Sequence, residues 1–315
     1  MEKQLWKACS DGKVEEVAQL LQNSLIDTNW QNDSIRSSVY LRTPLYIACR
    51  NGHIGIVKLL LNDQRIDINQ ADNDDRTPFY IACSRGHIEI VKLLLSVEGI
   101  DINKANKVSC TPFNIACGNG HVEIVKLLLS VERIDINKAQ KDGWTPFLIA
   151  CGNGYIEIVK LLLNDSRVDD IKKANRDGET PFLVACGFGH IDIVKILLSD
   201  ERIDINKAQK DGWTPFYIAC QKGHIEIVKL LLNDKRVDIN KGDDFGSTSF
   251  FLACENGYIE IVKLLLNDNR VDINKANNSS ATPLYLACQK RHIEIVKLLR
   301  ELISIRQIIM VIYLF

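Results

Sequence analysis

The chain has 315 residues, of which 46% are hydrophobic and 25% are charged, as expected for a folded soluble protein. Its 39 Lys and Arg residues nearly balance its 40 Asp and Glu residues, so the formal net charge is −1. Because this balance provides no overall basic field to attract a phosphate backbone, we do not expect a nucleic acid as the partner.

The first 41 residues begin with MEKQLWKACSDGK, which lacks the long apolar run of a secretory signal. We therefore expect a cytoplasmic or nuclear location rather than secretion. Residues 5–21 predict two short helices, and the second carries polar side chains that would cap one end of a stack of helices. An insertion at residues 24–41, with Trp30 and Tyr40, follows. Two roles for it stay open, a contact with a partner and support for the cap.

A Thr-Pro dipeptide then recurs with a spacing of 34 residues, and once of 35. Each Thr-Pro is followed by apolar or aromatic residues, then by Ala-Cys, and usually by Gly-His. The dipeptides begin at Thr43, Thr77, Thr111, Thr145, Thr180, Thr214 and Thr282, and Thr248-Ser249 fills the remaining place. Together with residues 5–21 they make nine copies. A period of this length predicts an elongated array of stacked repeats.

The third copy shows what one repeat should form. Thr77 is suited to cap a helix that starts at Pro78, and Gly86 is suited to end it in a left-handed conformation. In the next eight residues, 88–95, only two side chains are polar, so this second helix must lie between apolar neighbours. A polar loop and the β-prone tetrad Ile-Asp-Ile-Asn follow, which predicts an extended hairpin before the next Thr-Pro.

This pattern resembles the ankyrin repeat, whose signature is Thr-Pro-Leu-His-x-Ala followed by Gly-His and a helix with paired leucines. The resemblance covers residues 5–302 and implies a mainly α fold, an ankyrin-repeat solenoid with two helices and a β-hairpin loop in each repeat. Two departures stand out. The signature's His is replaced, often by Tyr as in Tyr46 and Tyr80, so its hydrogen bond must be lost or rebuilt. In addition, Arg291 replaces the turn glycine of the last repeat, and Asp170 adds a residue to a loop, so both places are expected to be locally strained or irregular.

The expected domain is residues 1–302. Its nine repeats lie at about 2–41, 42–72, 73–106, 107–140, 141–175, 176–209, 210–243, 244–277 and 278–302. An apolar tail, residues 303–315, follows and is too short to span a bilayer. Three interpretations of the tail stay open: it folds over the last repeat, it docks on a protein or touches a membrane, or the chain is the N-terminal part of something longer.

Ten cysteines raise the question of disulfides and metal sites. Nine occupy the same slot in successive first helices, too far apart to be bridged, and are expected to be reduced and buried. The recurring Cys-x-x-x-His pairs, such as Cys49 and His53, predict no metal site, because Tyr155 and Tyr258 replace the His in intact repeats. His is expected to cap or order the loop instead. Cys110, at a hairpin tip, is predicted to be an exposed surface thiol.

No catalytic site is predicted, because the acids, histidines and cysteines repeat in register and leave no unique constellation. We also expect no cofactor and no small-molecule substrate. Function should then reside in the side chains that differ between repeats. By resemblance to ankyrin proteins, these lie just before Thr-Pro, at the hairpin tips, and just after Ala-Cys, on the concave helix face. The candidate partner-binding residues are Arg50, Arg76, Arg85, Trp144, Glu179, Phe188, Trp213, Lys222 and Glu255.

Trp144 and Trp213 are the strongest candidates among them, since tryptophan contributes heavily to interfaces. An alternative stays open, in which each Trp packs on the adjacent hairpin. The favoured function is non-catalytic binding of a partner protein, as a scaffold or adaptor. Two others stay open, namely the cytosolic ankyrin region of a membrane-associated or longer multidomain protein, and a substrate-recognition subunit of a larger enzyme complex.

Overall fold

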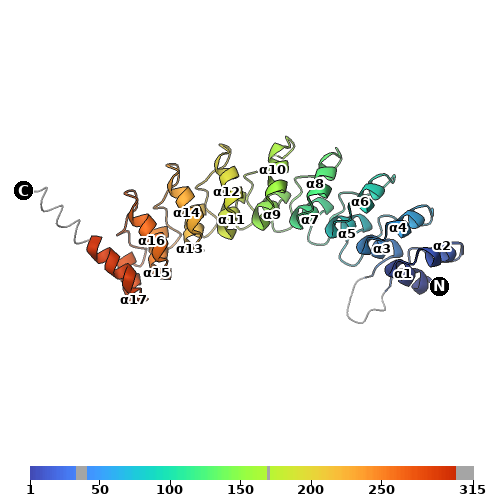
Figure 1. The fold of residues 1–315 in the computed structure, drawn as a ribbon, viewed down its shortest axis with the longest axis horizontal. Coiled ribbons are helices and arrows are strands. Elements are labelled where there is room, and N and C mark those ends of the chain that lie inside the picture. Colours follow the sequence, from blue (N-terminus) through green and yellow to red (C-terminus); the bar gives the residue numbers. More distant parts are fainter. Residues whose placement is uncertain (33–40, 169–170, 303–315) are drawn as a thin grey trace, which may run out of the picture. The chain divides into compact units, whose positions relative to one another are not determined.

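The computed structural model describes residues 1–32, 41–168 and 171–302, and this part of the chain is built from short helices in successive pairs (Figure 1). The helices are α1 (Glu2–Asp11), α2 (Val14–Leu21), α3 (Pro44–Asn51), α4 (Ile54–Leu61), α5 (Pro78–Arg85), α6 (Ile88–Leu95), α7 (Pro112–Gly118), α8 (Val122–Leu129), α9 (Pro146–Asn153), α10 (Ile156–Asn164), α11 (Pro181–Phe188), α12 (Ile191–Leu198), α13 (Pro215–Gln221), α14 (Ile225–Leu232), α15 (Ser249–Asn256), α16 (Ile259–Leu266) and α17 (Pro283–Gln289). Residues 293–302 are also helical and pair with α17. The predicted mainly α repeat architecture is confirmed.

The first helix of each pair begins and ends as its sequence predicts. In α5 the hydroxyl of Thr77 accepts a hydrogen bond from the backbone N–H of Tyr80 at 3.1 Å, and Pro78 is the first helical residue. Gly86 ends the helix with a φ of 77°, in the left-handed region that favours glycine. The last repeat places Arg291 in the same left-handed conformation, with a φ of 61°, so the turn is regular, but the strain expected for a non-glycine residue is present.

The second helix of each pair is apolar on most sides. In α6, Ile90, Val91 and Leu94 are buried, whereas Glu89 and Lys92 form an exposed ion pair of 2.7 Å. One narrow polar strip therefore faces solvent, and the remaining faces are covered by neighbouring helices.

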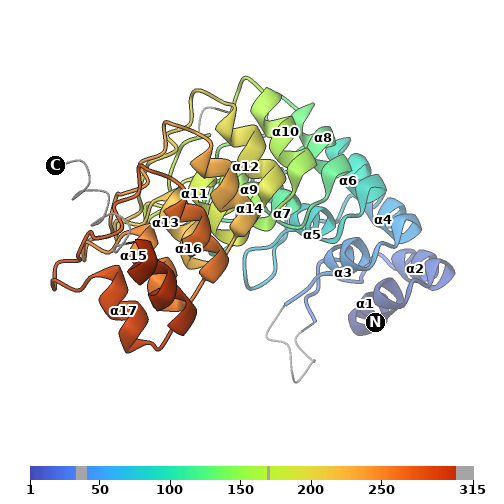
Figure 2. The ribbon, with the colours of Figure 1, turned by 60° about the vertical axis from the view of Figure 1, so that its left-hand side comes forward.

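The described residues divide into two compact units, which we call the N-terminal unit (1–150 with 157–168) and the C-terminal unit (151–156 with 171–302). In the N-terminal unit the first helices α1, α3, α5 and α7 pack on one another in succession, and α2, α4, α6 and α8 form a second row (Figure 1). The C-terminal unit repeats this arrangement, with α11, α13, α15 and α17 in one row and α12, α14 and α16 in the other (Figure 2).

Histidine and glycine connect successive repeats. The Nε2 atom of His121 lies 3.0 Å from the carbonyl oxygen of Ser84, in the preceding repeat. A Cβ atom added to Gly86 would lie only 2.8 Å from Cε1 of the same ring. His53, His87, His190, His224 and His292 make the equivalent bond. The predicted loop-ordering role of His is confirmed, and the close approach of the ring explains the glycine.

The tetrad Ile-Asp-Ile-Asn differs from its expected extended form. It folds as a turn, and the only β-bridge within the described residues joins Asn32 to Arg42. In residues 100–103 the carboxylate of Asp101 accepts from the N–H of Asn103 at 3.0 Å, and the Asn103 side chain donates to the carbonyl of Arg133 at 2.8 Å. Side-chain bonds to the backbone outweigh the β propensity of isoleucine here. The hairpin itself lies after the tetrad.

Candidate functional site

In five of the described hairpins the closing side chain is Asp or Asn, namely Asp72, Asn106, Asn175, Asp243 and Asn277, whereas Gln140 and Gln209 occupy this place in two others. In the third repeat the N–H of Asp72 donates to the carbonyl of Arg76 at 3.0 Å, while Oδ1 of Asp72 accepts from the N–H groups of Asp74 and Arg76, both at 3.0 Å. The chain turns at Asp75, whose φ is 62°. A short polar side chain is well suited to such a turn, because it replaces a backbone acceptor locally.

Adjacent hairpins bond to one another and form a continuous edge within each unit. Lys107 donates its N–H to the carbonyl of Asp74 at 3.0 Å, and Lys141 donates to Val108 at the same distance. In the C-terminal unit Lys210 donates to Asp177 at 3.0 Å. The hairpin tips are thus held at fixed positions, so their side chains form a pre-ordered surface.

The hairpins and the ends of the first helices line one hollow in the N-terminal unit. Its volume is about 420 Å³, and its walls include Arg76 and Val108 from two hairpins together with Tyr80 and Arg85 from α5. The two places in which the sequence predicted partner-binding residues therefore meet here. Arg76 and Arg85 are brought together at this hollow.

Two predicted residues are engaged in closing their own hairpins. Arg76 pairs with Asp72 at 2.7 Å and with Asp74 at 3.2 Å, and the Asp72 side chain is fully buried. Glu179 accepts a hydrogen bond from the Asn175 side chain at 2.7 Å. The charge of Arg76 is therefore partly compensated within the chain, and one oxygen of Glu179 already accepts a hydrogen bond, so both side chains have less to offer a partner.

Arg50 lies in the last turn of α3 and Arg85 is the last residue of α5, and neither forms an ion pair with any described residue. Partial burial, followed by the charges of Arg42 and Arg85, lowers the pKa of Arg50. Arg42 lies over the ring of Tyr46, with its guanidinium carbon 5.7 Å from the ring centre. Arg42, Arg50 and Arg85 therefore lie close together near the ends of α3 and α5 in the N-terminal unit.

The two tryptophans are half-buried rather than fully exposed. Trp213 stacks on Tyr217 with ring centres 5.9 Å apart, and the Tyr217 hydroxyl donates to Asp243 at 2.6 Å. Trp213 therefore packs on α13 of its own repeat, whereas the alternative prediction named the adjacent hairpin, and part of the Trp213 surface stays accessible. Trp144 occupies the equivalent place in its own hairpin.

Phe188 is the most exposed of the predicted aromatic residues. It ends α11, and 62% of its surface is accessible, although its ring lies 6.4 Å from that of His190. Lys222 is exposed at the corresponding place after α13, and Glu255 lies 3.9 Å from Lys290. Phe188 is therefore the clearest apolar contact point of the C-terminal unit.

Two exposed apolar residues were missed by the sequence reasoning. Phe245 and Val108 are 71% and 54% exposed, and both lie three residues before the capping threonine, at a hairpin tip. Most repeats have aspartate in this place, such as Asp74 and Asp142. The replacement of a turn-forming aspartate by an apolar residue was the signal that could have revealed them.

The prediction that Cys110 is an exposed thiol is wrong. Only 5% of its surface is accessible, and its sulfur lies 3.6 Å from the Tyr80 hydroxyl, because this side chain turns inward from the hairpin onto α5. Burial raises the pKa of this thiol. The expectation that the first-helix cysteines are buried holds for all but Cys288, which is exposed because no described first helix follows α17 to cover it.

The hydrogen bond of the replaced signature His is rebuilt in several ways. Tyr217 bonds Asp243 as above, and the hydroxyl of Tyr80 accepts from Asn106 at 3.3 Å. Asn114 forms a capping box with Thr111 and donates to the carbonyl of Lys138 at 2.9 Å. In these three repeats the substitute side chain connects the first helix to the segment that follows, whereas Leu148, Leu183 and Phe251 have no side-chain group that could form such a bond.

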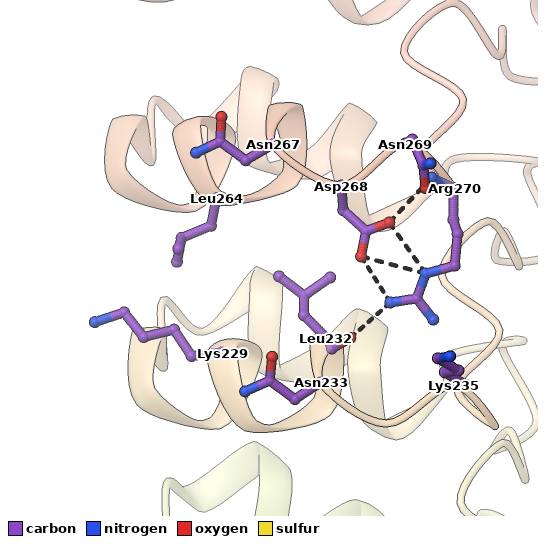
Figure 3. A pocket seen from close by; sticks show the side chains of 9 residues that line it. All are labelled: Lys229, Leu232, Asn233, Lys235, Leu264, Asn267, Asp268, Asn269 and Arg270. Atoms are coloured by element: carbon purple, nitrogen blue, oxygen red, sulfur yellow. Dashed lines mark hydrogen bonds and ion pairs between the residues drawn. The ribbon is translucent and has the colours of Figure 1, made fainter.

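A hollow of about 840 Å³ lies between the ends of α14 and α16, and the charged residues that line it connect neighbouring repeats (Figure 3). There Arg270 pairs with Asp268 at 2.6 Å and donates to the carbonyl of Leu232 at 2.6 Å. We call this arrangement the Arg-Asp staple. It recurs with Arg65, Arg167 and Arg236, each of which bonds a carbonyl of the preceding repeat. Its recurrence shows that it connects repeats.

No group of three or more His, Cys, Asp or Glu side chains in the described part of the chain could hold a metal ion. The absence of a metal, a cofactor and a catalytic group stays a prediction. None of the described helices combines the length and the apolar character needed to cross a membrane. The insertion at 24–41 is described only in part, and Asp170 and the 303–315 tail lie outside the described residues.

The repeat pattern agrees with a known family. The model of ankyrin repeats (3 copies) matches residues 5–106, 98–173, 167–243 and 235–307. No curated protein matched the chain. Ankyrin repeats are generally protein–protein interaction modules and are typically non-catalytic. Since the matches extend over nearly the whole chain and the helices stack in the corresponding pairs, the chain belongs to the ankyrin-repeat family.

Proposed function

We propose that this chain is a scaffold or adaptor that binds a partner protein without catalysis, through the hairpin tips and the adjoining ends of the first helices. The observation that carries the proposal is the 62% exposure of Phe188. Stacking does not require a phenylalanine at this place, because the equivalent residues are Asn51, Asn153 and Lys222. A large exposed side chain at a position free to vary is best explained by contact with another molecule.

The surroundings of Phe188 support a protein as that molecule. Phe245 and the half-buried Trp213 belong to the same C-terminal unit, and large aromatic side chains on a pre-ordered surface dominate protein interfaces. A rigid surface also loses little conformational entropy on binding.

The cytoplasm or the nucleus is the proposed location. All ten cysteines are free, and nine of them are buried. Burial raises the pKa of Cys9 and of Cys254 to about 12, so these thiols stay protonated at neutral pH. A chain with this many reduced cysteines suits a reducing compartment.

The first test compares proteins that co-purify from the source cell with the wild type and with a Trp144→Ala/Phe188→Ala/Trp213→Ala variant. Circular dichroism must first show that helical content is unchanged. Ile293→Ala is the matched control, because Ile293 is 68% exposed but lies on the second helix of the last pair. We expect the triple variant to lose one or a few proteins that the control retains.

A second readout replaces Phe188, and separately Ile293, by a photo-crosslinking phenylalanine analogue. Crosslinks to the same protein from position 188 but not from 293 would support the proposed surface. An unchanged set of co-purifying proteins, with no crosslink from 188, would show that these aromatic residues only pack within the repeat.

A further inference from the structure

The N-terminal unit carries arginines at the ends of its first helices, at positions where the fold does not require a positive charge. Arg50 and Arg85 occupy the two places after Ala-Cys, where other repeats have Gly118, Gly152 or Asn119. Because glycine and asparagine serve the fold equally well there, stacking does not explain the arginines.

The charges lie close enough to disfavour one another. The positive charges of Arg42, Arg85 and Arg76 each act against the charged form of Arg50, in addition to its partial burial. An array of like charges on a partly desolvated surface costs free energy in the free protein, and an anionic ligand removes that cost.

The acidic groups that face this cluster compensate it only in part. Asp72 and Asp74 both pair with Arg76, which leaves Arg50, Arg85 and Lys107 without an ion pair among the described residues. Asp75 is exposed at the same hairpin tip. The surface therefore combines two carboxylates at the hairpin tip with several cations beside them, so an anionic occupant must place its charges at the cations and away from the tip.

The hollow beside the cluster adds an apolar element. Val108 is 54% exposed and lines the same cavity of about 420 Å³ as Arg85, Lys107 and Tyr80. An occupant that fits must offer carboxylates to the arginines and an apolar side chain to Val108. An extended peptide can present both within a few residues.

We propose that the groove lined by Arg85, Lys107 and Val108, whose positive charge the neighbouring Arg50 extends, binds an acidic peptide segment of the partner protein that carries one apolar side chain. The inference rests on the proposed function and adds the chemistry of the partner. The forked guanidinium groups pair with carboxylates through two parallel hydrogen bonds, which makes arginine better suited than lysine to this task.

The test uses the full chain and a fluorescein-labelled dodecapeptide rich in Glu and Asp with a single central leucine, followed by fluorescence anisotropy. In the Arg50→Gln/Arg85→Gln variant we expect a loss of about five-fold in affinity for each arginine, or about twenty-five-fold for both. The matched control is Lys92→Gln/Lys126→Gln, which removes the same charge from exposed sites on α6 and α8. It should change affinity by less than about two-fold, because these charges act only through screened solvent.

Two further arms complete the test. Val108→Ser should weaken binding of the leucine peptide but not of the same peptide with alanine in its place. Equal losses in the arginine and lysine variants would overturn the proposal, since charge anywhere on the molecule would then suffice. Tighter binding of a single-stranded RNA than of the peptide would overturn it too.

A separate outcome distinguishes this inference from the proposed function. If a partner captured through Phe188 binds the Arg50→Gln/Arg85→Gln variant with unchanged affinity and unchanged salt dependence, protein binding stands and the acidic peptide is refuted.

Discussion

The contact between glycine and the histidine of the next repeat predicts how much a single methyl group should cost. Gly86 and Gly223 have nearly the same backbone, with φ of 77° and 75°. An added Cβ would lie 2.8 Å from the ring of His121 at Gly86, but 3.7 Å from the ring of Tyr258 at Gly223. Alanine at either place therefore meets the same backbone strain, and only Gly86→Ala adds a clash.

The strain of a left-handed alanine costs about 1–2 kcal/mol, and about 0.4–1 kcal/mol of this is recovered because alanine restricts the unfolded chain. We expect Gly223→Ala to lower the free energy of unfolding by about 1 kcal/mol. In Gly86→Ala the imidazole must also move away from the Ser84 carbonyl, 3.0 Å from its Nε2, and the loss of that hydrogen bond adds about 0.5–1.5 kcal/mol.

The assay is urea unfolding followed by circular dichroism, fitted with a nearest-neighbour model because repeats unfold with partial independence. His121→Ala provides a double-mutant cycle. Once the ring is removed, Gly86→Ala should cost no more than Gly223→Ala. Additive effects of Gly86→Ala and His121→Ala would refute the reasoning, since the methyl group and the ring would then act independently.

Three further outcomes follow from the structure. Arg291→Gly should raise the free energy of unfolding by about 1 kcal/mol in the same urea assay, because glycine relieves a φ of 61°. Native protein treated with iodoacetamide should be alkylated at Cys288 alone, whereas unfolded protein should react at all ten cysteines, as mass spectrometry can show. The hydrogen bonds from Arg236 lower the pKa of Asp234, so this staple stabilises the fold above about pH 4 and its contribution is lost as the pH falls further. Between pH 5 and pH 2 the free energy of unfolding measured with urea should consequently fall less in Asp234→Asn than in the wild type, with a difference of no more than about 1 kcal/mol because Arg236 is half exposed.

The helices were predictable because their signals are local. Thr77, Pro78 and Gly86 fix the ends of α5 through their own backbone preferences, and all three lie where the sequence predicts. The turn of the tetrad was not predictable in this way, because it depends on side-chain hydrogen bonds to the backbone. Asp101 accepts one within the tetrad, and Asn103 donates one to the next repeat. Propensity alone favours a strand for such residues.

The sequence predicted where in each repeat the candidate side chains lie, but not which other side chains they contact. The sequence placed the variable side chains correctly at hairpins and helix ends, and one hollow unites Arg76 with Arg85. That Arg76 is paired with Asp72, and that Cys110 turns inward to Tyr80, depends on three-dimensional contacts that a period of 34 residues does not reveal.

The asparagine of the tetrad has a consequence for how such a chain can change over time. Asn103 donates to the carbonyl of Arg133 and accepts from the N–H of Asp135, so it engages only main-chain atoms of its neighbour. Every amino acid supplies a carbonyl, and every one except proline supplies an N–H. These hydrogen bonds between neighbouring repeats therefore do not depend on the surface side chains of the next repeat. Those side chains can change, and with them the binding specificity, while the contact between the repeats is kept.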